Sequence, residues 1–191
     1  MRISGGESKG RKIKPPKHGG VRPTSDKVRE ALFSILGGKV DEASFLELFA
    51  GTGAVGIEAL SRGAARAVFV DSSVKSTRLI SENLQALDYR EHAAVVAKDV
   101  LQFLKKTASE LGPFNIVFVD PPYHEKVGME AMELLGADDA AYLSADALVV
   151  FEHFKKYPAT EEIGRLVKKK DYTYGDTVVS VYRLLEKEEG A

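Results

Sequence analysis

The chain contains no cysteine. That absence excludes disulfide bridges, thiolate zinc sites, iron–sulfur clusters and cysteine nucleophiles. No apolar run approaches the ~20 residues that a membrane-spanning helix needs, and the polar N-terminus does not resemble a signal peptide. The histidines at 18, 92 and 153 lack the spacing of metal ligands, so we expect no metal site. Together these absences predict a soluble, cytoplasmic protein, and the length of 191 residues predicts one principal domain.

The net charge of −1 hides an uneven distribution of charge. Residues 1–29 carry nine basic and two acidic side chains, a local charge of +7, which leaves −8 for the rest of the chain. A basic segment on an acidic body is typical of a phosphate-binding appendage, although runs of charge also occur in solvated tails. We therefore distinguish a basic N-terminal extension, residues 1–38, from a main domain, residues 39–191.

Short apolar segments alternate with amphipathic ones from Phe45 onward. The apolar segments predict strands, at Phe45–Phe49, Ala67–Val70, Ala93–Ala97, Phe114–Val119 and Ala147–Phe151. The amphipathic segments predict helices, at Ala54–Arg62, Ser73–Leu87, Val100–Leu111 and Lys126–Leu135. This alternation predicts a mostly parallel sheet covered by helices on both faces, which is a doubly wound α/β fold.

The two ends of the chain follow other patterns. Leu166–Tyr174 and Thr177–Leu185 flank the turn dipeptide Gly175-Asp176 and predict a terminal antiparallel hairpin. Near the N-terminus, Arg2–Ser4 and Arg11–Lys14 predict a small hairpin around three glycines. A helix is expected from the N-cap Ser25 to Leu36, where Gly37 and Gly38 end it.

A glycine-rich loop follows the first predicted strand. In the sequence from Glu47 to Gly56, ELFAGTGAVG, the glycines permit a tight turn and a close approach of the backbone to a ligand. Asp71 ends the second strand twenty residues after Gly51, where a carboxylate accepts hydrogen bonds from ribose hydroxyls. The pattern therefore predicts a ribonucleoside cofactor above the ends of these strands.

The glycines alone do not decide between cofactors, because Gly51, Gly53 and Gly56 also match the dinucleotide fingerprint. Glu47 favours S-adenosylmethionine, since a carboxylate suits its ammonium and sulfonium groups and offers nothing to a pyrophosphate; alternatively, Glu47 is an exposed residue at the strand end. Asp99 ends the third strand, where its carboxylate would reach an adenine amino group, cap the helix that begins at Val100, or do both.

The segment Asp120-Pro121-Pro122-Tyr123 after the fourth strand is the most specific motif in the chain. Two prolines make the loop stiff and poor in backbone donors, so the Asp120 carboxylate and the Pro121 carbonyl offer two acceptors beside the flat ring of Tyr123. An exocyclic amine of a nucleic-acid base donates two N–H groups and lies in the plane of a ring. The motif therefore predicts methyl transfer to such an amine, with the base removed from its stack.

Three segments together resemble one protein family. Glu47–Ala64, the Asp120–Tyr123 motif and the segment Arg22–Phe33, RPTSDKVREALF, resemble the bacterial 16S ribosomal RNA guanine-N2 methyltransferases of the RsmD type. The resemblance extends over nearly the whole chain. It implies a Rossmann-like class I methyltransferase fold with a seven-stranded sheet. Members of the family often have Glu where this chain has Asp71.

The resemblance also implies the cofactor, the partner and the site residues. The cofactor is S-adenosylmethionine, and the partner is 16S rRNA or a small-subunit particle, bound by a monomer. The catalytic residues are Asp120, Pro121, Pro122 and Tyr123. The cofactor-binding residues are Glu47, Phe49, Ala50, Gly51, Thr52, Gly53, Asp71, Ser72, Asp99, Val100 and Asp120. The RNA-binding residues of the basic extension are Arg11, Lys12, Arg22, Pro23, Thr24 and Arg29, and His124 is expected at the rim of the site.

Three other functions remain open at this point. An adenine-N6 methyltransferase acting on DNA or RNA would carry the same Asp120 loop, although DNA enzymes of that kind usually have a separate recognition domain. A nicotinamide-dependent oxidoreductase would explain Gly51–Gly56 and Asp71, but it leaves Glu47 and the Asp120 loop without a role. A non-catalytic ribosome assembly factor on the same scaffold is the third.

Overall fold

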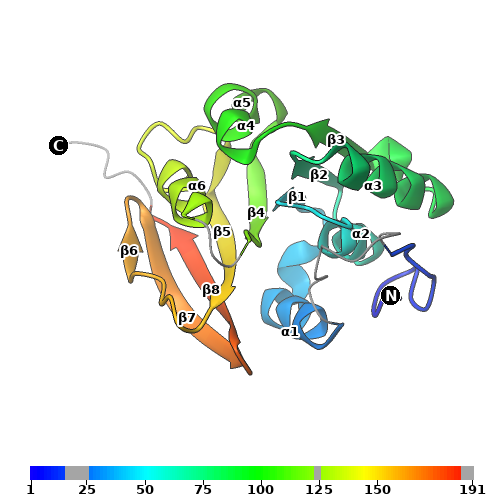
Figure 1. Ribbon diagram of the computed structural model, residues 1–191, viewed down its shortest axis with the longest axis horizontal. Helices are drawn as coiled ribbons and strands as arrows, with labels where there is room; N and C mark the ends of the chain where they lie inside the picture. The colour runs from blue at the N-terminus through cyan, green and yellow to red at the C-terminus, as the bar shows by residue number, and fades with distance from the viewer. Residues whose placement is uncertain (16–25, 123–125, 186–191) are drawn as a thin grey trace.

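The computed structural model describes residues 1–15, 26–122 and 126–185. Eight strands form one sheet in the order β3-β2-β1-β4-β5-β8-β7-β6 (Figure 1). The strands are β1 Ser44–Leu48, β2 Arg66–Asp71, β3 Ala93–Ala97, β4 Phe114–Val119, β5 Leu143–Phe154, β6 Glu162–Ile163, β7 Leu166–Tyr174 and β8 Thr177–Leu184. The helices are α1 Asp26–Leu36, α2 Ala54–Ser61, α3 Val74–Ala86, α4 Val100–Lys106, α5 Ala108–Leu111 and α6 Val127–Leu135, with 3-10 turns at Gly37–Val40 and Arg90–His92.

The sheet is parallel from β3 to β5 and antiparallel from β5 to β6. The chain begins in the middle with β1, moves outward through β2 to β3, and then crosses to β4 on the other side of β1. In open α/β sheets, ligands bind where the strand order reverses in this way, beyond the carboxyl ends of the strands. The reversal between β1 and β4 therefore marks the place for a site.

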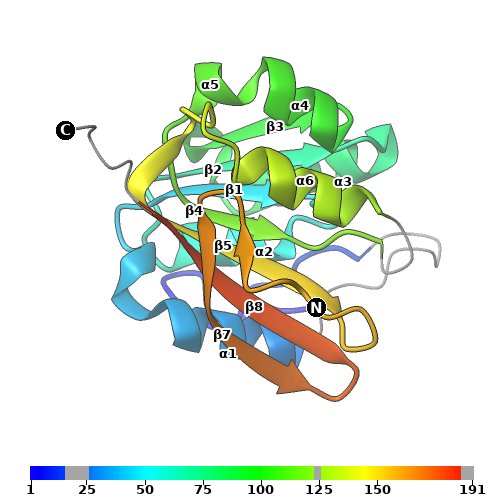
Figure 2. The same cartoon turned by 90° about the vertical axis from the view of Figure 1, so that its left-hand side faces the viewer.

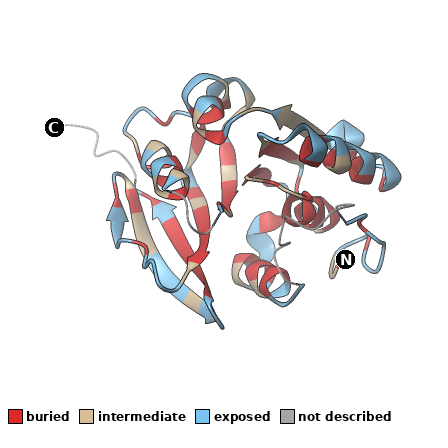
Figure 3. Ribbon diagram, in the orientation of Figure 1, coloured by how far each residue is buried: buried red, intermediate tan, exposed pale blue. Residues whose placement is uncertain are grey.

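Helices cover both faces of the sheet, and each face has its own core. One core, which we call the α2 face, contains buried side chains from α1, α2 and α3, among them Leu32, Ile57 and Ile80. The other, the α6 face, contains side chains from α4, α5 and α6, among them Phe103 and Met132. Figures 1 and 2 show the two sets of helices on either side of the strands, and the central strands are almost entirely buried (Figure 3).

The predicted doubly wound fold is confirmed, with differences in detail. The sheet has eight strands rather than seven, because the two-residue strand β6 pairs with β7 through Glu162↔Val167 and Ile163↔Leu166. The single helix expected over Val100–Leu111 is divided at Thr107, because the φ of this residue, −130°, is not that of a helix although its ψ, −27°, is close to helical. The C-terminal hairpin turns at Gly175-Asp176 as predicted. In the described part of the chain, no helix has both the length and the apolarity needed to cross a lipid bilayer.

The described part of the N-terminal extension is attached to the main domain rather than separate from it. The small hairpin is reduced to one antiparallel bridge, Arg2↔Lys12. Ile3 and Ile13 are both buried, and they belong to the core of the α2 face together with residues of α1, α2 and β1. The helix predicted from Ser25 is observed from Asp26, and Ser25 itself lies outside the described residues.

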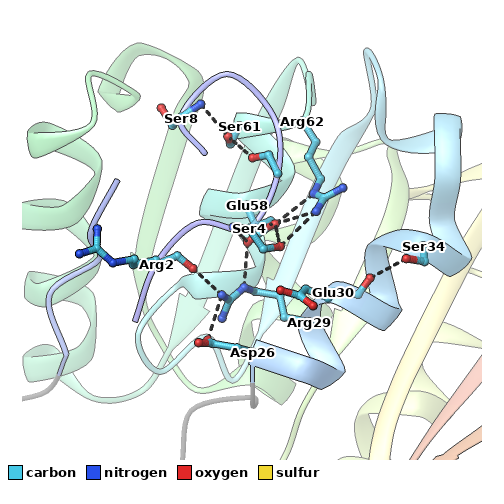
Figure 4. Close-up of polar contacts among 11 residues, drawn as sticks. Arg2, Ser4, Ser8, Asp26, Arg29, Glu30, Ser34, Glu58, Ser61 and Arg62 are labelled. Carbon is cyan, nitrogen blue, oxygen red and sulfur yellow. Dashed lines mark hydrogen bonds and ion pairs between the residues drawn. The ribbon is translucent and has the colours of Figure 1, made fainter. Parts of the chain in front are cut away.

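Buried charges join this extension to α2 (Figure 4). The carboxylate of Glu58 accepts hydrogen bonds from the backbone N–H and hydroxyl of Ser4, from Arg29 Nε at 2.8 Å, and from Arg62. The second guanidinium nitrogen of Arg29 donates to the carbonyl of Arg2 at 2.6 Å. Burial raises the pKa of Glu58, but the hydrogen bonds from Ser4, Arg62 and Arg29 outweigh it and bring the pKa below its ordinary value. Glu58 is therefore ionised at neutral pH.

Candidate active site

The sequence motifs converge at the carboxyl ends of four adjacent parallel strands. The glycine loop follows β1, Asp71 ends β2, Asp99 follows β3, and Asp120 follows β4. Strands β2 and β4 flank β1 on its two sides, so the loop after β1 lies between Asp71 and Asp120. Residues up to 73 positions apart in sequence, such as Glu47 and Asp120, are thereby brought to one edge of the sheet.

The loop after β1 uses a backbone conformation that most side chains avoid. Phe49, Gly51 and Gly53 all have positive φ, at 57°, 54° and 71°. For Phe49 this conformation is uncommon, and non-glycine residues held there concentrate at functional sites. The turn is closed by a hydrogen bond from Gly53 N–H to the Ala50 carbonyl at 2.7 Å. Ala50 and Thr52 are buried within the loop.

Asp71 holds the glycine loop through its side chain. One carboxylate oxygen accepts from Gly51 N–H at 2.8 Å, and the other accepts from Ser73 N–H at 2.8 Å. The carboxylate is therefore fixed in orientation beside the exposed Ser72, with further lone pairs left for the two hydroxyls of a ribose. This arrangement fits the nucleoside part of the predicted cofactor.

Glu47 is buried rather than exposed at the strand end. Its side chain points to the start of α2, where Oε2 accepts from Gly56 N–H at 2.8 Å. Burial raises the pKa of Glu47 to about 8; the N–H groups of Gly56 and Val55 oppose this rise, and Asp71 adds to it. A side chain at Gly56 would displace this carboxylate, since a Cβ there would lie 2.8 Å from Oε2. Glu47 thus helps to shape the loop, and a cation bound nearby would favour its ionised form.

Asp99 and Val100 form the start of α4. The Asp99 side chain accepts from Gln102 N–H at 3.0 Å, so Asp99 is the N-cap of α4, whether or not it also contacts a cofactor. Asp99 is exposed and Val100 is buried. The predicted contact between the Asp99 carboxylate and the adenine of the cofactor stays a prediction.

The loop after β4 is described as far as Pro122. Asp120 is partly exposed, Pro121 is buried and Pro122 is exposed. Pro121 packs against the first turn of α6, where a Cβ at Gly128 would come within 2.5 Å of its Cγ. Since neighbouring side chains of an extended segment point to opposite faces, Asp120 points to the α2 face, on which Glu47 also lies. Tyr123 and His124 lie outside the described residues.

The predicted RNA-binding residues are not equivalent. Lys12 is exposed. Arg11 is exposed as well, but its guanidinium donates to the carbonyls of Ala86 and Leu87 at the end of α3. Arg22, Pro23 and Thr24 lie outside the described residues.

Arg29 does not fit the predicted RNA contact. Its side chain is 0% exposed and forms ion pairs with Glu58 and Asp26. It therefore holds α1 against α2 instead of facing solvent. The spacing of apolar residues in α1 already indicated that Arg29 is buried. Val28, Leu32 and Leu36 form an apolar stripe on this helix, and Arg29 lies beside the stripe with Phe33.

Glu58 was not among the predicted functional residues. It is the only acidic residue of α2, and every residue of that helix is buried. A carboxylate in an otherwise apolar helix indicates a buried ion pair. Its partners Ser4 and Arg29 are 54 and 29 residues away, and no local pattern identifies partners at such separations.

The fold and the site together define a class I, S-adenosylmethionine-dependent methyltransferase. The strand order of the parallel sheet reverses at β1, the glycine loop there is held by the acidic residue Asp71 of the next strand, and an Asp-Pro-Pro segment follows β4. The family model described as "Conserved hypothetical protein 95" matches residues 1–183, and the chain belongs to this family, the RsmD family of methyltransferases. The predicted family is thereby confirmed.

Individual relatives agree with this assignment. The chain is 40% identical to "Ribosomal RNA small subunit methyltransferase D" of Escherichia coli K12 over 152 residues, which are 80% of this chain and 74% of the relative. It is 37% identical to YlbH of Bacillus subtilis over 183 residues, 96% of this chain and 98% of YlbH. Among solved structures, the Escherichia coli protein yhhF has a TM-score of 0.86 and 32% identity, with 98% of this chain and 99% of yhhF covered.

Proposed function

We propose that the protein methylates the exocyclic N2 amine of a guanine in 16S rRNA, with S-adenosylmethionine as the methyl donor. The observation that carries the proposal is the position of Asp120 at the end of β4, beside the loop that follows β1. The names of relatives such as "Ribosomal RNA small subunit methyltransferase D" support the choice of RNA. The guanine N2 target rests on the resemblance of Glu47–Ala64, Arg22–Phe33 and the Asp120 loop to the RsmD type.

Residues of the β1 and β2 ends would hold the cofactor. Asp71 would accept hydrogen bonds from the ribose, and the backbone of Gly51 and Gly53 would contact the methionine part, near the Glu47 carboxylate. Phe49, Ala50, Thr52, Ser72, Asp99 and Val100 complete the proposed cofactor-binding set. S-adenosylmethionine supplies an electrophilic methyl group bound to a positively charged sulfur.

Asp120 and the Pro121 carbonyl would hold the amine that accepts this methyl group. In guanine the N2 lone pair is delocalised into the ring, so the amine is a poor nucleophile. Acceptors at both N–H groups favour a more tetrahedral nitrogen and direct its lone pair toward the methyl group. The amine nitrogen would form its new bond to the methyl carbon as the C–S bond breaks with its electrons on sulfur, and the nitrogen would then lose one proton to water. Pro122 and Tyr123 would complete the loop, with the Tyr123 ring against the base.

The RNA would approach over the basic extension. Lys12, Arg11 and the segment Arg22–Thr24 are the proposed contacts, while Arg29 is withdrawn from this set because it is buried. We further propose that the protein acts as a monomer in the cytoplasm. Light scattering coupled to size exclusion tests the oligomeric state, with a single species of 20.8 kDa expected.

The decisive test is methyl transfer to small-subunit particles that lack the modification. The protein is incubated with methyl-tritiated S-adenosylmethionine, the RNA is digested, and the labelled nucleoside is identified. We expect N2-methylguanosine from 16S rRNA, and a loss of at least about 100-fold in rate for Asp120→Ala, the size expected when transition-state contacts are removed.

Asp146→Ala is the matched control, because this exposed aspartate lies on β5 near its amino end, away from the site. It should transfer methyl groups at the rate of the unmodified protein. Label in N6-methyladenosine would overturn the guanine target and retain the catalytic loop. Cofactor binding without label in RNA or DNA would instead indicate a non-catalytic assembly factor.

A further inference from the structure

A second buried carboxylate lies beside the catalytic loop, and no motif of the sequence pointed to it. Glu152 is on β5, near the carboxyl end of the strand, and only 3% of it is exposed. Strands β4 and β5 are parallel neighbours, and Val119 pairs with Phe151. One residue further along each strand, Asp120 and Glu152 therefore lie side by side, at the ~4.8 Å spacing of adjacent strands.

Glu152 lies on the same face of the sheet as Asp120. Side chains alternate along β5, and Phe151 belongs to the core of the α6 face while Val150 belongs to that of the α2 face. Glu152 therefore points to the α2 face. Its partner in register on β8, Val179, belongs to the α2-face core as well. Glu47 on β1, Asp120 directly after β4 and Glu152 on β5 thus lie on one side of the sheet.

A buried carboxylate is an uncommon side chain for this part of the sheet. Val150 and Val179, its neighbours along β5 and across on β8, are both apolar and both 0% exposed. Titratable groups buried next to a catalytic residue concentrate at functional sites, and Glu152 lies next to the residue that would hold the substrate amine.

We propose that Glu152 selects guanine by accepting a hydrogen bond from its N1–H, while Asp120 and the Pro121 carbonyl accept the N2 hydrogens. This inference deepens the proposed function and rests on it. On the Watson–Crick edge of guanine, N1–H and the amine are adjacent donors that point the same way. Two carboxylates on adjacent strands offer adjacent acceptors to match them.

The same arrangement rejects adenine. Adenine also has an exocyclic amine, but the ring nitrogen next to it, N1, carries a lone pair rather than a hydrogen. A carboxylate facing that lone pair would be repelled and left without a donor, and sites built around a hydrogen bond reject analogues that lack it by factors of about 10⁴. Asp120 alone does not distinguish the two amines, whereas Asp120 with Glu152 does.

The test compares two bases at the target position of a synthetic RNA or reconstituted particle. 2-Aminopurine keeps the N2 amine of guanine but has an unprotonated N1. The unmodified protein should methylate guanine at least about 100-fold faster in kcat/KM than 2-aminopurine. Glu152→Gln presents an amide N–H to that unprotonated N1, so this ratio should fall at least about 10-fold in the variant, with the affinity for S-adenosylmethionine unchanged.

The ratio separates recognition from damage to the fold. A variant that is merely misfolded loses activity on both bases alike, and an unchanged ratio in Glu152→Gln would overturn the inference. Glu133→Gln, an exposed acidic residue on α6, is the control and should leave both rates unchanged. If the unmodified protein forms no N2-methylguanosine at all, the proposed function fails instead, which keeps the two outcomes distinct.

Discussion

Arg29 Nε donates to Glu58 Oε2 at 2.8 Å, and both side chains are 0% exposed (Figure 4). This contact joins α1, at the end of the basic extension, to α2, the helix that opens directly after the glycine loop. A buried ion pair is therefore among the contacts that link the extension to the helix after the cofactor loop.

Removal of Arg29 is expected to destabilise the protein strongly. Arg29→Ala leaves Glu58 buried with only part of its hydrogen bonds, and breaking such a pair costs about 3–5 kcal/mol. The free energy of unfolding in urea measures the loss. Arg78→Ala is the control, because Arg78 and Glu82 form an exposed pair for which less than about 1 kcal/mol is expected. Equal losses in the two variants would show that the buried pair does not secure α1.

The raised pKa of Glu47 predicts a stability that declines with pH. The pKa is about 8 in the folded protein against an ordinary 4.5, so the folded state binds an extra proton between these values. The free energy of unfolding should accordingly fall as pH rises from about 5 to 8. Glu47→Gln cannot titrate, and its unfolding free energy should vary less over this range. Glu58 affects the free energy of unfolding in a different pH range. Because its pKa is lowered in the folded protein, the stability that its ionised form contributes is lost only as the pH falls below 4.5.

Asp71 is expected to control cofactor affinity. Asp71→Asn weakens the hydrogen bonds that fix Gly51 and Ser73 and removes the charge offered to the ribose. Calorimetric titration with S-adenosylmethionine should show a Kd raised at least about 10-fold, which corresponds to about 1.4 kcal/mol. Asp88→Asn provides the matched exchange at an exposed aspartate and should bind as before. A normal Kd for Asp71→Asn would remove the ribose contact from the proposed site.

Gly56 is expected to tolerate no side chain. In Gly56→Ala the new Cβ would lie 2.4 Å from Phe69 Cε1 and 2.8 Å from Glu47 Oε2, so the buried Phe69 ring and the Glu47 carboxylate must move. Overpacking of this kind costs about 1–3 kcal/mol, and a displaced glycine loop should also weaken cofactor binding. Thermal unfolding measures the first effect. Gly38→Ala has open space around its Cβ and should unfold near the temperature of the unmodified protein.

The sequence was sufficient for features that depend on neighbouring residues. The Asp99 cap, the turn at Gly175-Asp176 and the start of α2 after Gly53 were all predicted, because each is set by backbone chemistry within a few positions. The convergence of Glu47, Asp71 and Asp120 was also predictable, since parallel strands bring their carboxyl ends to one edge.

Features that depend on distant partners were not predictable in this way. The family resemblance predicts an RNA contact for Arg29, whereas Arg29 is buried in an ion pair with Glu58 on another helix. The importance of Glu152 depends on the β4–β5 register, which places it beside a residue 32 positions earlier. Strand β6 has only two residues and is too short to show any periodicity.

The attachment of the N-terminus has a consequence for synthesis of the chain. Ser8 accepts a hydrogen bond from the Tyr89 hydroxyl across 81 positions, and Lys14 N–H donates to Asn83. During synthesis Ser8 must therefore wait until Tyr89 has been added to the chain, about 4–16 s at translation rates of roughly 5–20 residues per second. Ile3, Ile13 and the basic side chains around them stay uncovered during that interval, next to the surface of the translating ribosome.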